Sequence, residues 1–174
     1  RKGNVHPLTV IRLGTSGGPQ AEIECGTFAI AQYALGLDNT GMYYETPAQD
    51  QTVLDIEREA YTIITQNTPE TARFRGRIHP YASRASPDVV AALGMSAQAL
   101  QAKYVVGITA SASGFYGPQG REIPGLPITV PRLQEHVARL RVNGSRVVAL
   151  GEEMAVDNEG RFFPTKFEME SILF

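Results

Sequence analysis

Three short segments of this sequence combine residue types that can bind a small polar or anionic ligand. The first, residues 10–18 (VIRLGTSGG), runs from apolar residues into a glycine-rich turn. Its glycines let backbone N–H groups approach an anion, Thr15 and Ser16 add hydroxyl donors, and the planar guanidinium of Arg12 matches phosphate oxygens. An arginine within a buried strand also needs an anionic partner. The segment therefore predicts a phosphate site, with a plain glycine-rich turn as the alternative.

The second segment, residues 107–121 (GITASASGFYGPQGR), leads from a strand through small residues to an aromatic pair and then to Gln119 and Arg121. An amide and a guanidinium together offer an acceptor and several donors to the edge of a pyrimidine ring, and Phe115 offers a face for stacking. The alternative is a polar turn in which Phe115 and Tyr116 pack back on the core. The ordered combination indicates a base pocket.

The third segment, residues 167–171 (FEMES), carries two carboxylates near the end of the chain. In an extended backbone Glu168 and Glu170 point to the same side, where they can accept hydrogen bonds from vicinal hydroxyls. Met169 offers an adaptable apolar surface to a sugar ring. The alternative is a solvated acidic turn at the start of a helix.

Composition excludes several classes of protein. The 174 residues, of which 43% are hydrophobic and 20% charged, suit one globular domain. Apolar runs are too short to span a bilayer, and a net charge of −2 with scattered basic residues argues against a nucleic-acid partner. The single cysteine, Cys25, favours a reducing compartment, so we expect a cytoplasmic protein in which Cys25 is a small core residue. The chain starts at Arg1 and ends on an apolar run, which we interpret as part of a longer chain.

The order of expected elements predicts the fold class. Strand and helix patterns alternate along most of the sequence, and this favours an α/β fold with a single-domain mixed β-sheet core flanked by helices. The expected strands are residues 8–13, 26–35 and 104–110, the expected helices are residues 50–65, 86–93, 96–101 and 131–142, and residues 147–163 are expected to form a hairpin around residues 157–160.

Taken in order, the three segments resemble the nucleoside phosphorylase family and most closely its uridine phosphorylase branch. The resemblance rests on IRLGTSGG, GITASASGFYGPQGR and FEMES. It implies one nucleoside phosphorylase domain over residues 1–174, incomplete at both ends, that cleaves uridine with phosphate to uracil and ribose 1-phosphate in pyrimidine salvage. It also implies a homodimer or higher homo-oligomer with a shared active site. No cofactor or metal is implied, because inorganic phosphate is itself a substrate.

The resemblance assigns a role to each matched residue. Arg12, Gln119, Arg121 and Glu170 are the implied catalytic residues. The implied ligand contacts are Arg12, Gly14 and Thr15 to phosphate, Ser16, Gly17, Phe115, Gln119 and Arg121 to the base, and Glu168, Met169 and Glu170 to the ribose.

The sequence departs from the family pattern in three places. Gly117 precedes Pro118, the reverse of the usual order, and Gly120 stands where many relatives carry a charged residue. The stretch between Arg121 and Phe167 is long, with the expected hairpin as extra structure. Three alternatives therefore stay open: a nucleosidase that uses water, against which Arg12 argues, a purine nucleoside phosphorylase of the same fold, and a non-catalytic nucleoside-binding module.

Overall fold

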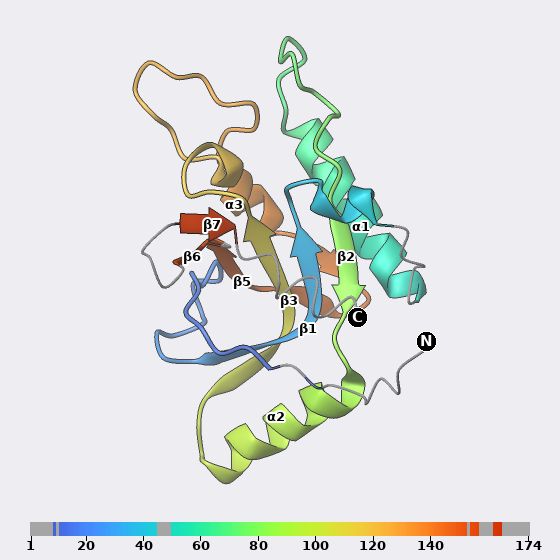
Figure 1. Ribbon diagram of the computed structural model, residues 1–174, viewed down its shortest axis with the longest axis vertical. Helices are drawn as coiled ribbons and strands as arrows, with labels where there is room; N and C mark the ends of the chain where they lie inside the picture. The colour runs from blue at the N-terminus through green and yellow to red at the C-terminus, as the bar shows by residue number, and fades with distance from the viewer. Residues whose placement is uncertain (1–8, 10, 45–49, 153, 157–161, 165–174) are drawn as a thin grey trace, which may run out of the picture.

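A five-stranded mixed sheet forms the centre of the molecule (Figure 1). The structure is a computed structural model that describes residues 9, 11–44, 50–152, 154–156 and 162–164. The strand order is β2-β1-β3-β5-β4, with parallel pairing in the middle and an antiparallel strand at each edge. The strands are β1 (Phe28–Gly36), β2 (Tyr81–Arg84), β3 (Tyr104–Ala112), β4 (Arg141–Val142) and β5 (Ser145–Glu152). The α/β class and the mixed sheet predicted from the sequence are confirmed.

One face of the sheet carries the main hydrophobic core, beneath α1 (Gln51–Gln66) and α3 (Leu133–Val137). Side chains alternate between the faces of a strand, so Leu35 and Ala110 point toward these helices, away from the face that Ala34 and Thr109 line. The apolar positions of α1 recur every three or four residues and are buried in this core. The predicted helix over residues 50–65 is thus confirmed.

The start of α1 is set by Asp50. Its carboxylate accepts a hydrogen bond from the backbone N–H of Val53 at 3.0 Å, which satisfies one of the donors left unpaired at a helix N-terminus. The helix ends at Asn67, whose N–H donates to the carbonyl of Ile63. Both ends agree with the sequence prediction.

The opposite face of the sheet is covered in part by α2 (Pro87–Ala99). We predicted two short helices here, and the structure has one. Ser96 does not start a new helix, because its hydroxyl donates to the carbonyl of Ala92 at 2.9 Å within the same helix. Gly94 does not break the helix either: it is buried, and an added Cβ would lie 3.7 Å from the ring of Tyr104.

The predicted strand over residues 8–13 is wrong within the part that the structure describes. Residues 9 and 11–16 have no regular secondary structure, and the apolar side chains of Ile11 and Leu13 are 58% and 82% exposed. A strand needs a neighbouring strand to hydrogen-bond with, and pairing begins only at Gly17. Gly17 and Leu150 exchange two backbone hydrogen bonds of 2.8 and 2.9 Å. Leu150 lies on β5 beyond the two residues that pair with β4.

The helix expected over residues 131–142 is much shorter than predicted. Only Leu133–Val137 is helical, and Arg141–Val142 pairs with β5 instead. Asn143 and Gly144 both have positive φ, 47° and 82°, which is the conformation of a two-residue hairpin turn. Asn143-Gly144 therefore joins β4 to β5 and does not end a helix over residues 131–142.

The later hairpin is confirmed. β6 (Met154–Val156) and β7 (Phe162–Pro164) pair antiparallel in a separate two-stranded sheet. The turn residues 157–160 lie outside the described residues. Residues 145–152 are not extra structure, since β5 is an inner strand of the main sheet.

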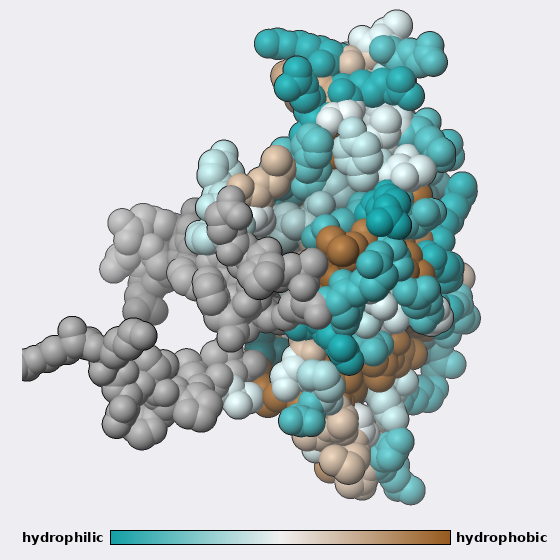
Figure 2. Space-filling view, turned by 90° about the vertical axis from the view of Figure 1, so that its right-hand side faces the viewer, coloured by the Kyte–Doolittle hydropathy of each residue, from teal (hydrophilic) through white to brown (hydrophobic). Residues whose placement is uncertain are grey.

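Figure 2 shows mostly hydrophilic residues toward the top of the molecule and apolar patches at mid-height and below it. Cys25 is exposed, so its prediction as a core residue is wrong. It lies in the turn before Gly26, whose φ of 85° directs the chain into β1. No helix among the described residues has both the length and the apolar character that a bilayer crossing requires.

Candidate functional site

A pocket of about 260 Å³ opens at the edge of the sheet where the parallel strands end. We call it the edge pocket. Because β1, β3 and β5 are parallel, their carboxyl ends share this edge, which is where α/β sheets bind ligands. The residues that line the edge pocket are Gly17, Gly18, Pro19, Gln119, Arg121, Gln134, Glu135, Ala138 and Leu150. The structure thus brings the first and second predicted segments together.

The polar side of the edge pocket is built by a single turn of 3₁₀ helix, η2 (Gly117–Gln119). The carbonyl of Tyr116 accepts the N–H groups of both Gln119 and Arg121, each at 3.0 Å. These two bonds turn the chain so that the side chains two positions apart reach the same pocket. Gln119 is only 4% exposed.

Gly120, between them, has a φ of 74° and permits this turn. Its carbonyl accepts the N–H of Arg132 at 2.8 Å. An added Cβ would lie 2.1 Å from the backbone nitrogen of Leu133. The loop that leads into α3 therefore packs directly on Gly120, which explains the absence of a side chain at this departure from the family pattern.

Arg121 is held by two neighbours. Its guanidinium carbon lies 4.1 Å from the centre of the Phe115 ring, and its Nε–H donates a long hydrogen bond of 3.4 Å to Oε1 of Gln119. The Phe115 and Tyr116 rings are exposed and pack edge to face at 5.3 Å. The alternative in which both aromatics pack back on the core is therefore wrong.

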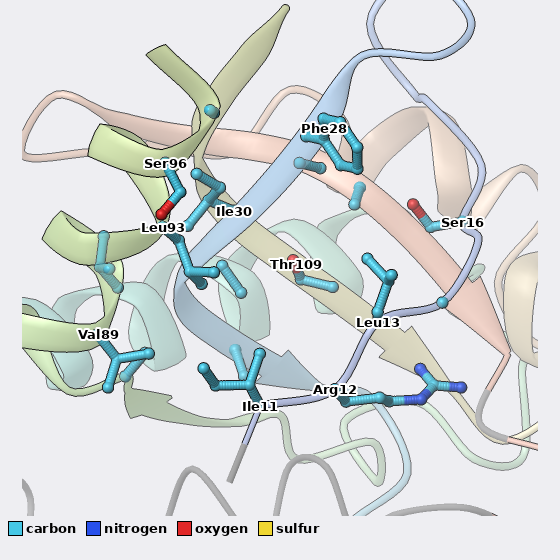
Figure 3. A pocket seen from close by; sticks show the side chains of 18 of the residues that line it. Ile11, Arg12, Leu13, Ser16, Phe28, Ile30, Val89, Leu93, Ser96 and Thr109 are labelled. Carbon is cyan, nitrogen blue, oxygen red and sulfur yellow. The ribbon is translucent and has the colours of Figure 1, made fainter. Parts of the chain in front are cut away.

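The other predicted anion-binding residues line a different pocket of about 390 Å³, shown in Figure 3. We call it the apolar pocket. It lies between residues 11–16, α2 and the face of the sheet that carries Ala149. Ile11 and Leu13 point into it, and Val89 and Leu93 face them from α2. Arg12, Gly14, Thr15 and Ser16 are part of its lining.

Arg12 is exposed, so the argument from an arginine in a buried strand does not hold. Its side chain extends away from the apolar side chains (Figure 3) and folds over the backbone of Gly14, where an added Cβ would lie 3.2 Å from the guanidinium carbon. Ser16 borders the apolar pocket and Gly17 borders the edge pocket. The Gly-Thr-Ser-Gly segment thus separates the two pockets.

The predicted ribose residues Glu168, Met169 and Glu170 lie outside the described residues. Among the described residues, no three His, Cys, Asp or Glu side chains gather closely enough to hold a metal ion.

Besides Gly18 and Pro19, which directly follow the predicted Gly17, sequence reasoning missed four residues of the edge pocket: Gln134, Glu135, Ala138 and Leu150. They come from α3, from the turn after it and from β5, segments that we had interpreted as helix and hairpin without a ligand role. Periodicity revealed that Leu133 and Val137 are buried, but it could not show that the neighbouring polar positions face η2. That proximity depends on the packing of Gly120 against the start of α3.

Comparison with known protein families assigns the chain to a family. The model of the phosphorylase superfamily matches residues 3–153. The chain belongs to this superfamily. The matched range includes both pockets of this phosphorylase-superfamily chain, and the resemblance stated from the sequence is confirmed at this level.

A solved structure with the same fold is a Trypanosoma brucei nucleoside phosphorylase, described as showing uridine phosphorylase activity. The two structures superpose with a TM-score of 0.64 at 29% sequence identity. The match covers 82% of this chain and 46% of the trypanosome chain, so this sequence spans about half the length of that relative. No curated protein sequence matches the chain.

Proposed function

We propose that this protein is a nucleoside phosphorylase of the uridine type, which converts uridine and inorganic phosphate to uracil and ribose 1-phosphate. The observation that carries the proposal is the pairing of Gln119 with Arg121 in the edge pocket, opposite Gly17. Membership of the phosphorylase superfamily supports the reaction type, and the described activity of the trypanosome neighbour supports the substrate.

The chemistry requires two groups of contacts, one that stabilises the departing uracil and one that holds phosphate. An oxygen of phosphate forms a bond to C1′ as the C1′–N1 bond breaks, and the electron pair of that bond leaves with N1 of uracil. The barrier falls where the protein stabilises the departing uracil anion. Phosphate is the nucleophile, so no side-chain nucleophile is needed.

Gln119 and Arg121 have the right donors for the leaving base. The Nε–H of Arg121 is directed at Oε1 of Gln119, which turns the amide NH₂ of Gln119 and the two Nη groups of Arg121 toward other partners. The carbonyl oxygens of uracil are acceptors, and they gain negative charge as the bond to ribose breaks. Donors preorganised around them bind the transition state more tightly than the substrate.

On the phosphate side we propose Arg12, the backbone of Gly14 and the hydroxyl of Thr15. Arg12 and Thr15 belong to the same exposed segment as Gly17, a few residues from the edge pocket. We propose Glu168, Met169 and Glu170 as the ribose contacts on the strength of the family resemblance alone. The same resemblance supports a homo-oligomer with a shared active site that acts in pyrimidine salvage, and the single cysteine supports a cytoplasmic location.

The test is a cleavage assay on the full-length protein with uridine, thymidine and inosine, each with and without phosphate. We expect uridine cleavage that depends on phosphate and yields ribose 1-phosphate. Equal cleavage without phosphate would indicate a nucleosidase, and preferential cleavage of inosine would indicate a purine phosphorylase. Incubation of uracil with ribose 1-phosphate should give uridine, which a binding module cannot form.

A further inference from the structure

Gln20 has a buried side chain whose hydrogen bonds join three parts of the chain. Its Nε2 donates to the carbonyl of Ala138 and to the carbonyl of Val147, both at 2.8 Å. Its Oε1 accepts from Nη2 of Arg141 at 3.2 Å. The amide therefore connects the segment after the glycine turn to the end of α3 and to β5.

Only a glutamine makes this set of bonds. The NH₂ group has two hydrogens, and each is directed at a backbone carbonyl. A glutamate in the same place has no donor when ionised, and an aliphatic side chain leaves the partners without their bonds. A buried polar group without a hydrogen-bond partner destabilises the folded protein, so position 20 requires glutamine.

The bonds of Gln20 lie beside the edge pocket. Residues 17–19 form one wall of that pocket, and the wall has an anchor at each end. At one end Gly17 exchanges two backbone hydrogen bonds with Leu150, and at the other the Gln20 amide bonds to Ala138 and Val147. Leu150 and Ala138 are themselves pocket residues.

We propose that Gln20 is a positioning residue for the base-binding pocket. By fixing the wall of residues 17–19 against Ala138, it sets the width of the pocket between that wall and the donors of Gln119 and Arg121. Arg141 supports it from the other side of the amide. This inference rests on the proposed function, because it takes the ligand of the edge pocket to be the base of a nucleoside.

The test is Gln20→Met in the full-length protein, since methionine keeps the length and removes every hydrogen bond. We expect kcat/KM for uridine to fall roughly 10-fold to 100-fold, because small displacements in a binding site cost that much. The loss should lie mainly in KM for uridine, while KM for phosphate stays within about twofold. Hydrogen exchange at the amide of Gly17 should become faster, since its bond to Leu150 loses its neighbouring anchor.

A second variant, Arg141→Met, keeps the proposal testable if Gln20→Met fails to fold. Arg141 is exposed, and its loss removes one of the three bonds of the Gln20 amide together with its own bonds to the carbonyls of Ala138 and Leu140, so we expect a change in the same direction. Gln98→Met is the matched control, because it removes an exposed hydrogen bond from Gln98 to the Tyr104 hydroxyl and neither residue lines either pocket. This variant should change neither KM for uridine nor hydrogen exchange at Gly17.

The outcomes separate this inference from the proposed function. Unchanged KM for uridine in both variants, even with a lower melting temperature, would show that Gln20 is only structural. Absence of uridine turnover in the unmodified protein would instead refute the proposed function. In that case hydrogen exchange at the Gly17 amide still tests the positioning role. Equal exchange rates in Gln20→Met and in the unmodified protein would overturn that role.

Discussion

The guanidinium carbon of Arg121 lies 4.1 Å from the centre of the Phe115 ring, and Nε–H of the same side chain is directed at Gln119. Arg121 is thus held between an aromatic face and an amide oxygen. An arginine fixed in this way loses less conformational freedom when a ligand binds than one that extends into solvent. Phe115 therefore orients Arg121 in this structure, in addition to the stacking role expected from the sequence.

Gln119→Leu tests the donor pair directly. Leucine keeps approximate bulk but removes the amide proposed to bind the base and the oxygen that accepts the Nε–H of Arg121. We expect kcat/KM for uridine to fall by about 100-fold to 1,000-fold, the usual cost of one preorganised donor, with KM for phosphate nearly unchanged. Steady-state kinetics with each substrate varied in turn measures both. Uridine turnover equal to that of the unmodified protein would show that Gln119 does not bind the base.

Arg12→Ala tests the phosphate assignment. Removing a charge-assisted donor to an anion should raise KM for phosphate at least about 10-fold while KM for uridine changes little. Arg58→Ala is the matched control, because Arg58 is an exposed arginine that pairs with Asp55 on the surface of α1. The assignment would be lost if Arg12→Ala and Arg58→Ala had the same phosphate dependence.

The sequence predicted best those features that depend on local chemistry. The helix over residues 50–65 and the strand over residues 104–110 follow from residue type and periodicity, and the structure has both as α1 and β3. The edge pocket was only partly predictable: the segment after β3 lies at the carboxyl edge of the parallel strands, whereas Gly17 reaches the pocket through an antiparallel bridge to Leu150 that no sequence pattern indicated.

The errors occurred where a local pattern was compatible with two structures. Residues 8–13 have strand composition, but composition does not supply a pairing partner, and the described part of that segment is exposed coil. Asn143 and Gly144 can end a helix or turn a hairpin, and only the pairing of β4 with β5 selects the hairpin. Glu135 lines the edge pocket because of tertiary packing, and no local sequence pattern indicates that position.

Gly120 should tolerate no side chain. Gly120→Ala must place a Cβ 2.1 Å from the nitrogen of Leu133 at a φ of 74°, so backbone has to move. We expect a loss of more than about 2 kcal/mol in the free energy of unfolding, measured by urea denaturation.

Gly125→Ala separates strain from collision. Gly125 has nearly the same φ, 77°, but an added Cβ would meet nothing within 4 Å. This variant should lose only about 1 kcal/mol, the cost of a left-handed conformation for an L-residue. Equal losses at the two positions would show that the packing of Gly120 against α3 contributes little.

The last prediction concerns Glu57, which lies on α1 and accepts the N–H of Ala82 at 2.9 Å from β2. Burial raises the pKa of its carboxyl, and the hydrogen bond from Ala82 offsets only part of that shift. The folded state therefore holds this proton more tightly than the unfolded state does. The stability that comes from the bound proton is fully present below the ordinary glutamate pKa of about 4.3, and it is lost as the pH rises through the raised pKa.

Glu57→Gln should consequently be more stable than the unmodified protein at pH 7, because an amide oxygen still accepts the Ala82 N–H without a half-buried charge. The difference in melting temperature should shrink as the pH is lowered toward about 4, where Glu57 itself is protonated. Glu59→Gln, at an exposed position of the same helix, is the control and should show no such convergence. A Glu57→Gln variant that is less stable than the unmodified protein at pH 7 would show that the ionised carboxylate stabilises the contact between α1 and β2.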